Sequence, residues 1–319
     1  MHEFELIKKY FSKLSINNKG SLGLNDDVFF DKSRSLVVSV DTYTEGVHFL
    51  DFKKPDLVIK KIIRSSISDL ICKGVEPKYY FISGSGNNKS FSESNFKKIS
   101  SSLRKEQNKY NIFLCGGDTV LSKKLSFTIT SIGFSKKIIF RNKAKLNDDI
   151  YVTGNLGDSY IGLKILKKEI KLNKNLEKYF KNRYFLPNLN LNIIKKLPSF
   201  ANTSIDISDG LIADLEKLIN KQKFSYRLLL KNIPISKNLK KLINLKKYEK
   251  KSLISNGDDY QILFTANSSK SRIISKISKS SGIKISKIGK ICSSTLKSAV
   301  IDEKGNKIVF KSKGYYHRF

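Results

Sequence analysis

The segments SLVVSVD, residues 35–41, and DLVIKKIIRSSISDLICKGVEPKYYFIS, residues 56–83, decide the fold class of this chain. β-Branched residues dominate the first segment, which predicts a strand over 35–40. In the second segment apolar residues recur at helical spacing until Gly74, and a further β-rich run follows at 79–83. The order strand, helix, strand favours an α/β or α+β class.

Strands and helices continue to alternate on both sides of this stretch. The other predicted strands are 28–30, 111–115, 125–134, 150–153, 226–230, 260–265 and 285–291, and the predicted helices are 1–11, 57–73, 91–110, 159–168, 211–221 and 269–281. A charged turn at 142–149 interrupts the alternation, and 319 residues exceed one ordinary domain core. We therefore predict two domains of comparable size, 1–141 and 142–319.

The charge balance is strongly basic, with 61 Lys and Arg residues against 28 Asp and Glu residues and a formal net charge of +33. Such a balance raises the possibility of nucleic-acid binding. The lysines are spread over almost every predicted helix and form no single stripe, so a solvated lysine-rich surface is the favoured interpretation. We expect no specific nucleic-acid partner, although the surface would attract anionic metabolites.

The cellular setting follows from the cysteines and the apolar runs. Cys72, Cys115 and Cys292 are widely spaced and odd in number, which predicts neither a disulfide framework nor a zinc site. No apolar run is long enough to span a bilayer, and the acidic residues near the start do not fit a signal peptide. We expect a cytoplasmic protein without a membrane partner.

Aspartates beside glycines and at the ends of predicted strands are the informative feature against this basic background. They stand in the segments 25–27 (NDD), 39–42 (SVDT), 116–119 (GGDT), 206–211 (DISDGL) and 257–260 (GDDY). Short acids placed in this way can converge on hard cations, which prefer oxygen ligands. Asp69 lies one turn from the end of its predicted helix, where the helix dipole disfavours negative charge, so a cation is expected nearby.

Each of these segments also has a purely structural interpretation. The acid pairs at 26–27 and 258–259 could form turns. The glycines at 116–117 could make a tight turn or let backbone N–H groups approach a phosphate. Ser208 or Asp209 could be the N-cap of the helix that follows, but Asp206 would then remain as an additional carboxylate.

Two other features carry no chemistry. The loop GSGNNKS at 84–90 fits neither a Walker sequence nor a dinucleotide fingerprint. His48 is the one interior histidine, and no Ser–His–Asp or Cys–His arrangement can be assembled around it. Nucleophilic catalysis is therefore disfavoured.

Taken together and in order, the motifs resemble the thiamine-monophosphate kinase family, from about residue 3 to the C-terminus. The matching segments are 25–27, 39–42, 46–49 (GVHF), 68–70 (SDL), 116–119, 151–154 (YVTG), 206–211, 257–260 and 313–315 (KGY). The wider superfamily includes aminoimidazole ribonucleotide synthetase. The chain departs from the family pattern where Asn25, Ser66 and Asn256 replace Gly, Asn and Gly, and where Asp258 replaces a glutamate that is one methylene longer.

The resemblance implies a two-domain fold like that of aminoimidazole ribonucleotide synthetase, in which the N-terminal sheet forms a barrel with that of a second subunit and a C-terminal α/β domain packs beside it. A homodimer is therefore expected. The implied reaction is transfer of the γ-phosphoryl group of ATP to thiamine phosphate, with several Mg²⁺ ions, giving thiamine diphosphate and ADP.

The resemblance also implies roles for individual residues. The metal ligands would be Asp27, Ser39, Val40 through its backbone, Asp41, Asp69, Asp118, Asp206 and Asp209, of which Asp27, Asp69, Asp118, Asp206 and Asp209 are the expected catalytic residues. ATP would contact Gly117, Asp118, Arg141 and Ser208. Thiamine phosphate would contact His48, Asp258 and Tyr315.

Elementary chemistry agrees with this expectation, because phosphoryl transfer needs alignment and charge neutralisation more than covalent help. Two alternatives stay open. Another ATP-using enzyme of the superfamily, of the synthetase type, would use similar chemistry on a different acceptor. A basic nucleic-acid-binding protein would explain the net charge, but not the aspartates gathered beside glycines.

Overall fold

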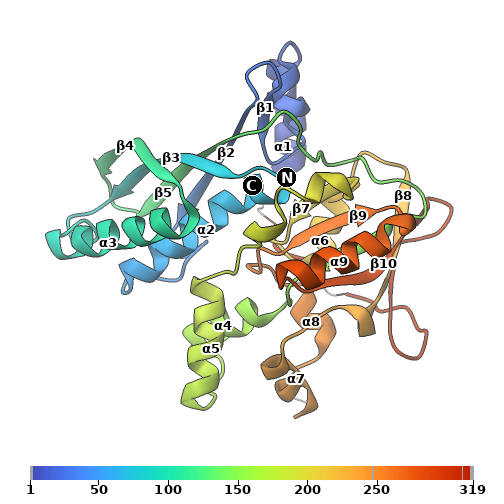
Figure 1. Ribbon diagram of the computed structural model, residues 1–319. Coiled ribbons are helices and arrows are strands. Elements are labelled where there is room, and N and C mark those ends of the chain that lie inside the picture. The colour runs from blue at the N-terminus through green and yellow to red at the C-terminus, as the bar shows by residue number, and fades with distance from the viewer. Residues whose placement is uncertain (1–2, 246–247, 311, 317–319) are drawn as a thin grey trace.

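The computed structural model of the protein describes residues 3–245, 248–310 and 312–316. Two sheets, one from each half of the chain, lie side by side with helices packed against them (Figure 1). The fold is mixed α/β, as the alternation of strand and helix patterns predicts.

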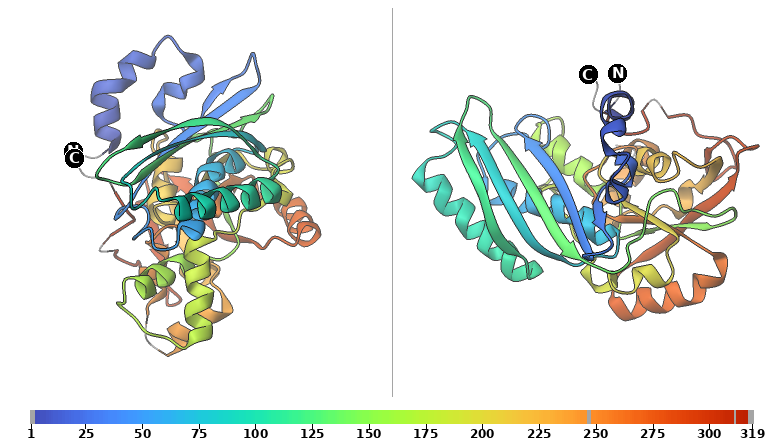
Figure 2. Two further views of the ribbon diagram at one scale, coloured as in Figure 1. Left: turned by 90° about the vertical axis from the view of Figure 1, so that its left-hand side faces the viewer. Right: turned by 90° about the horizontal axis from the view of Figure 1, so that it is seen from above.

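The first sheet has the strand order β1-β2-β5-β3-β4. Its strands are β1 (Phe29–Asp31), β2 (Leu36–Thr44), β3 (Pro77–Gly86), β4 (Phe113–Leu121) and β5 (Ser126–Phe134). The β3–β4 pair is parallel and the other pairs are antiparallel. Helices α2 (Pro55–Cys72) and α3 (Glu93–Tyr110) lie along one face of this curved sheet (Figure 2).

The second sheet has the order β11-β8-β10-β6-β9-β7. Its strands are β6 (Asp149–Thr153), β7 (Thr203–Asp206), β8 (Phe224–Leu229), β9 (Ile262–Ala266), β10 (Ile285–Ser293) and β11 (Ala299–Ile301). The accompanying helices are α4 (Asp158–Leu166), α5 (Lys174–Phe185), α6 (Leu211–Leu218), α7 (Lys237–Asn244), α8 (Lys250–Ile254) and α9 (Ser271–Ser281). Strand β6 is buried along its whole length, which explains its continuous apolar run.

Side chains from both halves form one continuous core around α2. Ile62 and Ile67 of α2 belong to the same buried cluster as Tyr151 and Phe264 of the second sheet. The rings of Tyr151 and Phe264 stack with 5.3 Å between their centroids. The carboxyl end of α2 therefore reaches the boundary between the two sheets.

Several predicted elements need correction. The segment 3–11, predicted as one amphipathic helix together with residues 1–2, which lie outside the described ranges, is a short helix α1 (Glu3–Leu6) followed by a π-helical turn, Ile7–Phe11. Three short helices (α5, α7 and α8) and two short strands (β7 and β11) were not predicted. Within the described ranges, no helix is long and apolar enough to cross a membrane.

Candidate active site

Four of the predicted aspartates lie within electrostatic reach of one another near the carboxyl end of α2, between the two sheets. Asp27 precedes β1, Asp41 lies on β2, Asp69 occupies the last turn of α2 and Asp206 ends β7. Alternation along β2 turns Asp41 toward the side of the sheet that α2 covers. Each of Asp41, Asp69 and Asp206 experiences the charge of Asp27. The tertiary structure therefore gathers these carboxylates from separate parts of the chain.

Burial and mutual repulsion disfavour the charged forms of three of these carboxylates. Burial, reinforced by Asp27, raises the pKa of Asp41 and that of Asp206 to about 7. Burial together with Asp41, Asp206 and Asp27 raises the pKa of Asp69 well above its usual value. A positive charge placed among these carboxylates would stabilise their ionised forms.

The hydrogen-bond donors to these three carboxylates are hydroxyl groups. Ser39 Oγ donates to Asp69 Oδ2 at 2.5 Å, and Ser68 Oγ donates to Asp206 Oδ2 at 2.7 Å. Tyr43 donates to Asp41 Oδ2 at 3.3 Å. Val40, whose backbone carbonyl is the expected ligand, lies between Ser39 and Asp41 and turns its side chain outward with 61% of its surface exposed.

Asp27 is in a different environment from the other three carboxylates. Lys73 Nζ lies 2.7 Å from Asp27 Oδ2, and Arg141 Nη1 lies 3.5 Å from Asp27 Oδ1. Burial alone would raise the pKa of Asp27, but the charges of Arg141 and Lys73 outweigh burial and hold that pKa well below its usual range. Arg141, expected to contact ATP, is buried, and its Nε donates to the carbonyl of Asn25 at 3.0 Å.

Asp209 forms an ion pair with Lys217, whose Nζ also lies 3.0 Å from Asp214 Oδ1. The interpretation of Ser208 or Asp209 as a helix N-cap is wrong, because the N-cap of α6 is Gly210. Asp214 accepts hydrogen bonds of 3.0 Å from the backbone N–H groups of Asp209 and Gly210 and so satisfies the start of that helix. Asp209 is therefore free of a capping role.

Gly117 and Asp118 lie within the edge strand β4 and not in a turn. Asp118 is paired in register with Ser83, Ser83 with Thr128, and Thr128 with Thr42. Three inter-strand spacings, about 14 Å in total, thus separate Asp118 from β2. A Cβ atom on Gly117 would meet the carbonyl oxygen of Ile82 at 1.7 Å, so close packing of β4 on β3 explains the glycine there.

His48 and Asp258, predicted to contact the same substrate, are joined through Tyr184. The backbone N–H of Thr44 donates to His48 Nδ1 at 3.0 Å, so in the neutral ring the proton resides on Nε2. The Tyr184 hydroxyl donates to the His48 carbonyl at 3.4 Å, and the Tyr184 ring lies under Lys61, which binds Asp258.

Lys61 is a component of the site that sequence reasoning missed. Its Nζ lies 2.7 Å from Asp258 Oδ1 and 3.9 Å from the centre of the Tyr184 ring, and the side chain is 1% exposed. Burial lowers the pKa of Lys61 although Asp258 opposes this effect. The Tyr260 hydroxyl donates to the same oxygen of Asp258 at 3.1 Å. The signal in the sequence is a lysine on the apolar face of a helix, next to Ile62.

The other predicted contacts of ATP and substrate lie near the start of α6. The backbone N–H of Tyr315 donates to the Asp209 carbonyl at 3.0 Å, and the Tyr315 side chain is half exposed. The carbonyl of Ser208 accepts from the N–H of Asp258 at 2.8 Å. A Cβ atom on Gly257 would meet that Ser208 carbonyl at 1.8 Å, so a glycine is required there. This contact connects the 208–209 loop with the 257–258 turn.

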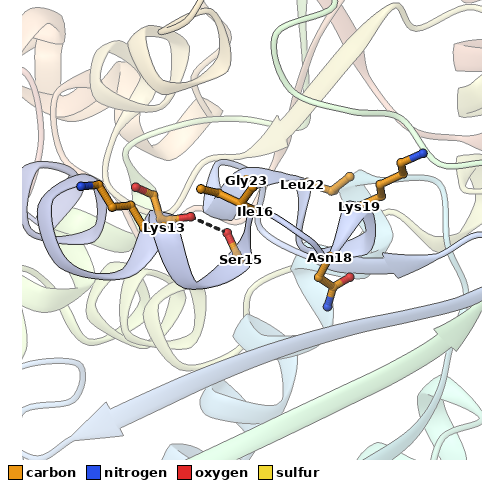
Figure 3. A pocket seen from close by; sticks show the side chains of 8 residues that line it. Lys13, Ser15, Ile16, Asn18, Lys19, Leu22 and Gly23 are labelled. Atoms are coloured by element: carbon orange, nitrogen blue, oxygen red, sulfur yellow. Dashed lines mark hydrogen bonds between the residues drawn. The ribbon is translucent and has the colours of Figure 1, made fainter.

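Two cavities in the described part of the chain are lined by residues other than these carboxylates. One of about 450 Å³ is lined by a single stretch of chain, residues 12–23, that includes Lys13 and Lys19 (Figure 3). Another of about 420 Å³ lies between α3 and strands β3 and β4. As the described side chains stand, no three His, Cys, Asp or Glu groups converge closely enough to hold a metal ion directly.

The chain resembles known proteins over nearly its whole length. The family model described as AIR synthase related protein, N-terminal domain, matches residues 24–135. The chain is 36% identical to the thiamine-monophosphate kinase of Buchnera aphidicola subsp. Acyrthosiphon pisum over 99% of its own length and 98% of that protein. It is 34% identical to the enzyme of the same name from Buchnera aphidicola subsp. Schizaphis graminum, over 99% and 98% of the two chains.

A solved structure of AaThiL complexed with AMPPCP and TMP covers 99% of this chain and 97% of its own, with 27% identity and a TM-score of 0.85. Full-length similarity at this level of identity goes beyond a shared fold. The chain belongs to the thiamine-monophosphate kinase family.

Proposed function

We propose that this protein transfers the γ-phosphoryl group of ATP to thiamine phosphate, giving thiamine diphosphate and ADP. The observation that carries the proposal is the group formed by the half-buried Asp41 and Asp69 and the buried Asp206. These carboxylates accept hydrogen bonds from hydroxyl groups and repel one another electrostatically. Reacting two phosphorylated molecules requires such a concentration of ligands for positive charge.

Mg²⁺ fits these residues, because every donor in the group is an oxygen atom and hard cations prefer oxygen ligands. The proposed ligands are Asp27, Ser39, the Val40 carbonyl, Asp41, Asp69 and Asp206, with Asp209 also contributing. Asp118, about 14 Å from β2, would hold a separate one of the several ions. Asp209 would have to exchange its partner Lys217 for an ion. Bound Mg²⁺ would neutralise phosphate charge during the transfer.

The chain's own residues would bind and orient the two reactants. The acceptor phosphate has a second pKa of roughly 6, so it is ionised near neutral pH and needs no general base. His48 can donate a hydrogen bond from Nε2 to the substrate, and Arg141 can stabilise negative charge on a phosphate through its planar guanidinium group. Asp258, held by Lys61, and the aromatic ring of Tyr315 would attract the cationic ring of thiamine phosphate. Gly117, Asp118 and Ser208 are the further proposed contacts of ATP.

The experiment that tests the function is a coupled assay of ADP release with thiamine phosphate, unphosphorylated thiamine and formylglycinamidine-type acceptors offered in turn. We expect Mg²⁺-dependent turnover with thiamine phosphate, and thiamine diphosphate as the second product. Turnover with the formylglycinamidine-type acceptor alone would favour the synthetase alternative and reject the proposed substrate.

We further propose two domains, 1–141 and 142–319, and a homodimer formed through the outer face of the first sheet. The separation of the two sheets between β5 and β6 supports the boundary. The outer face carries exposed apolar side chains, among them Val40 and Phe81, which both stand in register with Thr130. Apolar side chains in adjacent positions of a sheet favour burial against another surface.

The dimer can be tested with Phe81→Glu. We expect the wild type to have twice the chain mass of 36.3 kDa in light scattering and the variant to be a monomer, because a charge cannot be buried unpaired between two sheets. The matched control is Leu296→Glu, which charges an exposed apolar residue, 58% exposed, in the second half of the chain. Dimers of unchanged mass in Phe81→Glu would place the interface elsewhere.

A further inference from the structure

Lys73 is a buried lysine whose ammonium group is surrounded by oxygen atoms of the protein. Its side chain is fully buried, and its Nζ lies 2.7 Å from Asp26 Oδ1, 2.7 Å from Asp27 Oδ2 and 2.9 Å from the carbonyl oxygen of Ser204. Three oxygen atoms from two segments of the chain, 26–27 and Ser204, thus surround one ammonium group. Lys73 is the C-cap residue that directly follows α2, so its charge also complements the negative end of that helix dipole.

Both carboxylate oxygens of Asp26 have partners within the protein. Its Oδ1 also accepts from the N–H of Asp27, and its Oδ2 accepts from the N–H of Arg141 at 2.9 Å. Asp26 therefore has a structural role, and it fixes Lys73 beside Asp27. The second oxygen of Asp27 has Arg141 at 3.5 Å as its charged neighbour.

The two ends of the carboxylate group consequently differ. At the Asp26–Asp27 end, the chain supplies its own cation, Lys73. At the other end, Asp41, Asp69 and Asp206 accept hydrogen bonds from neutral hydroxyl groups. Burying carboxylates without a positive partner is unfavourable by several kcal/mol for each charge. An added cation is therefore needed mainly beside Asp41, Asp69 and Asp206.

We propose that Lys73 is a resident cation of the active site: its ammonium group takes the place of a metal ion between Asp26 and Oδ2 of Asp27 and positions Asp27, so that Mg²⁺ enters at the Asp41–Asp69–Asp206 end, with Oδ1 as the oxygen that Asp27 offers to the ion. This inference rests on the proposed magnesium site and specifies which part of it the chain itself neutralises. Lys73 is a positioning residue, because its fully buried Nζ acts through Asp26 and Asp27, which it binds.

The test compares Lys73→Met with the wild type by thermal unfolding in EDTA and in a Mg²⁺ titration without nucleotide. Methionine keeps the length of the side chain but removes the charge. We expect the variant to melt lower than the wild type in EDTA and to gain about twice the wild-type increase in Tm on adding Mg²⁺, since an ion now also binds at the vacated end. Counting bound Mn²⁺ by electron paramagnetic resonance should show one more ion per chain than in the wild type.

Three further variants separate the possible outcomes. Lys73→Arg keeps the charge and should respond to Mg²⁺ like the wild type. Lys61→Met removes another buried lysine of α2, paired with Asp258 outside the carboxylate group, and should melt lower without a larger Mg²⁺ response. Adding Asp26→Asn to Lys73→Met restores the original net charge and should remove the additional response.

An equal Mg²⁺ response in Lys73→Met and the wild type would overturn the inference and leave Lys73 a structural residue. A Lys73→Met chain that stays unfolded at every Mg²⁺ concentration would also count against it, because the ion must restore the fold. If the wild type itself shows no response to Mg²⁺ or Mn²⁺, with or without an ATP analogue, the proposed magnesium site fails, which is a different result.

Discussion

Asp69→Asn should lower kinase activity by a hundredfold or more, on the order of the loss expected when charge stabilisation in the transition state is removed, and yet leave the metal-free protein at least as stable as the wild type. The carboxylate of Asp69 is repelled by Asp41 and Asp206 and lies in the last turn of α2. Charge at a helix end is worth about 0.3–1 kcal/mol, here unfavourably. A neutral amide removes both penalties while its oxygen can still accept from Ser39.

The same substitution should weaken stabilisation by ligands. Mg²⁺ with a non-hydrolysable ATP analogue should raise the Tm of the wild type by mass action and that of Asp69→Asn much less. Asp31→Asn is the control, because Ser33 and Arg34 hold that carboxylate at the sheet edge, so its ligand-induced shift and activity should stay normal. If Asp69→Asn melts well below the wild type without metal and keeps the full ligand shift, Asp69 has a structural role and the proposed site is misplaced.

The metal-free protein should lose stability as the pH rises from about 4 to above 7. An aspartate in the unfolded chain releases its proton near 3.8, whereas Asp41 and Asp206 in the folded protein have pKa values of about 7. Between these values the folded state binds more protons, so the free energy of unfolding falls by up to about 1.4 kcal/mol per pH unit for each such carboxyl. The loss is complete above the folded pKa.

Mg²⁺ should reverse this pH dependence, because the ion binds the deprotonated carboxylates. The measurement is urea unfolding at pH 5 and pH 8, each in EDTA and in Mg²⁺, and the stabilisation by Mg²⁺ should be larger at pH 8. Burial also raises the pKa values of Asp158 and Asp259, so these residues add to the loss of stability in EDTA. They accept hydrogen bonds from Ser236 and from the N–H of Gly157 and are not among the proposed Mg²⁺ ligands. Metal-free protein that is more stable at pH 8 than at pH 5 would contradict the prediction.

Elements with a regular apolar pattern could be predicted closely from the sequence. The helix predicted at 57–73 is α2, Pro55–Cys72, because its apolar residues recur on one face and Gly74 ends the pattern. Helix α5 was missed because a run of lysines and asparagines carries few buried side chains, Phe180, Tyr184 and Phe185. The interpretation of 116–119 as a turn was wrong because two glycines also suit an edge strand that packs closely on its neighbour.

The carboxylates of the site could be named from their motifs, but their charged partners could not. Lys61 and Lys73 are 2 among 61 basic residues. Although Lys61 stands on the apolar face of its helix, almost every helix carries several lysines, so position alone does not identify a buried one. Their partners are distant in the chain: Lys61 binds Asp258, and Lys73 binds Asp26 and Asp27. Only the tertiary fold brings these charges together. The roles of all the predicted metal, ATP and substrate contacts stay predictions.

The bonds that cross from α2 to β7 also have a mechanical consequence. Lys73 Nζ donates to the Ser204 carbonyl, Ser204 Oγ donates to the Cys72 carbonyl, and Ser68 Oγ donates to Asp206. Swinging the two sheets apart at this seam would break all three bonds and bring a buried ammonium group into contact with water. The seam therefore resists separation of the two sheets and keeps Asp69 of α2 and Asp206 of β7 at a fixed distance from each other.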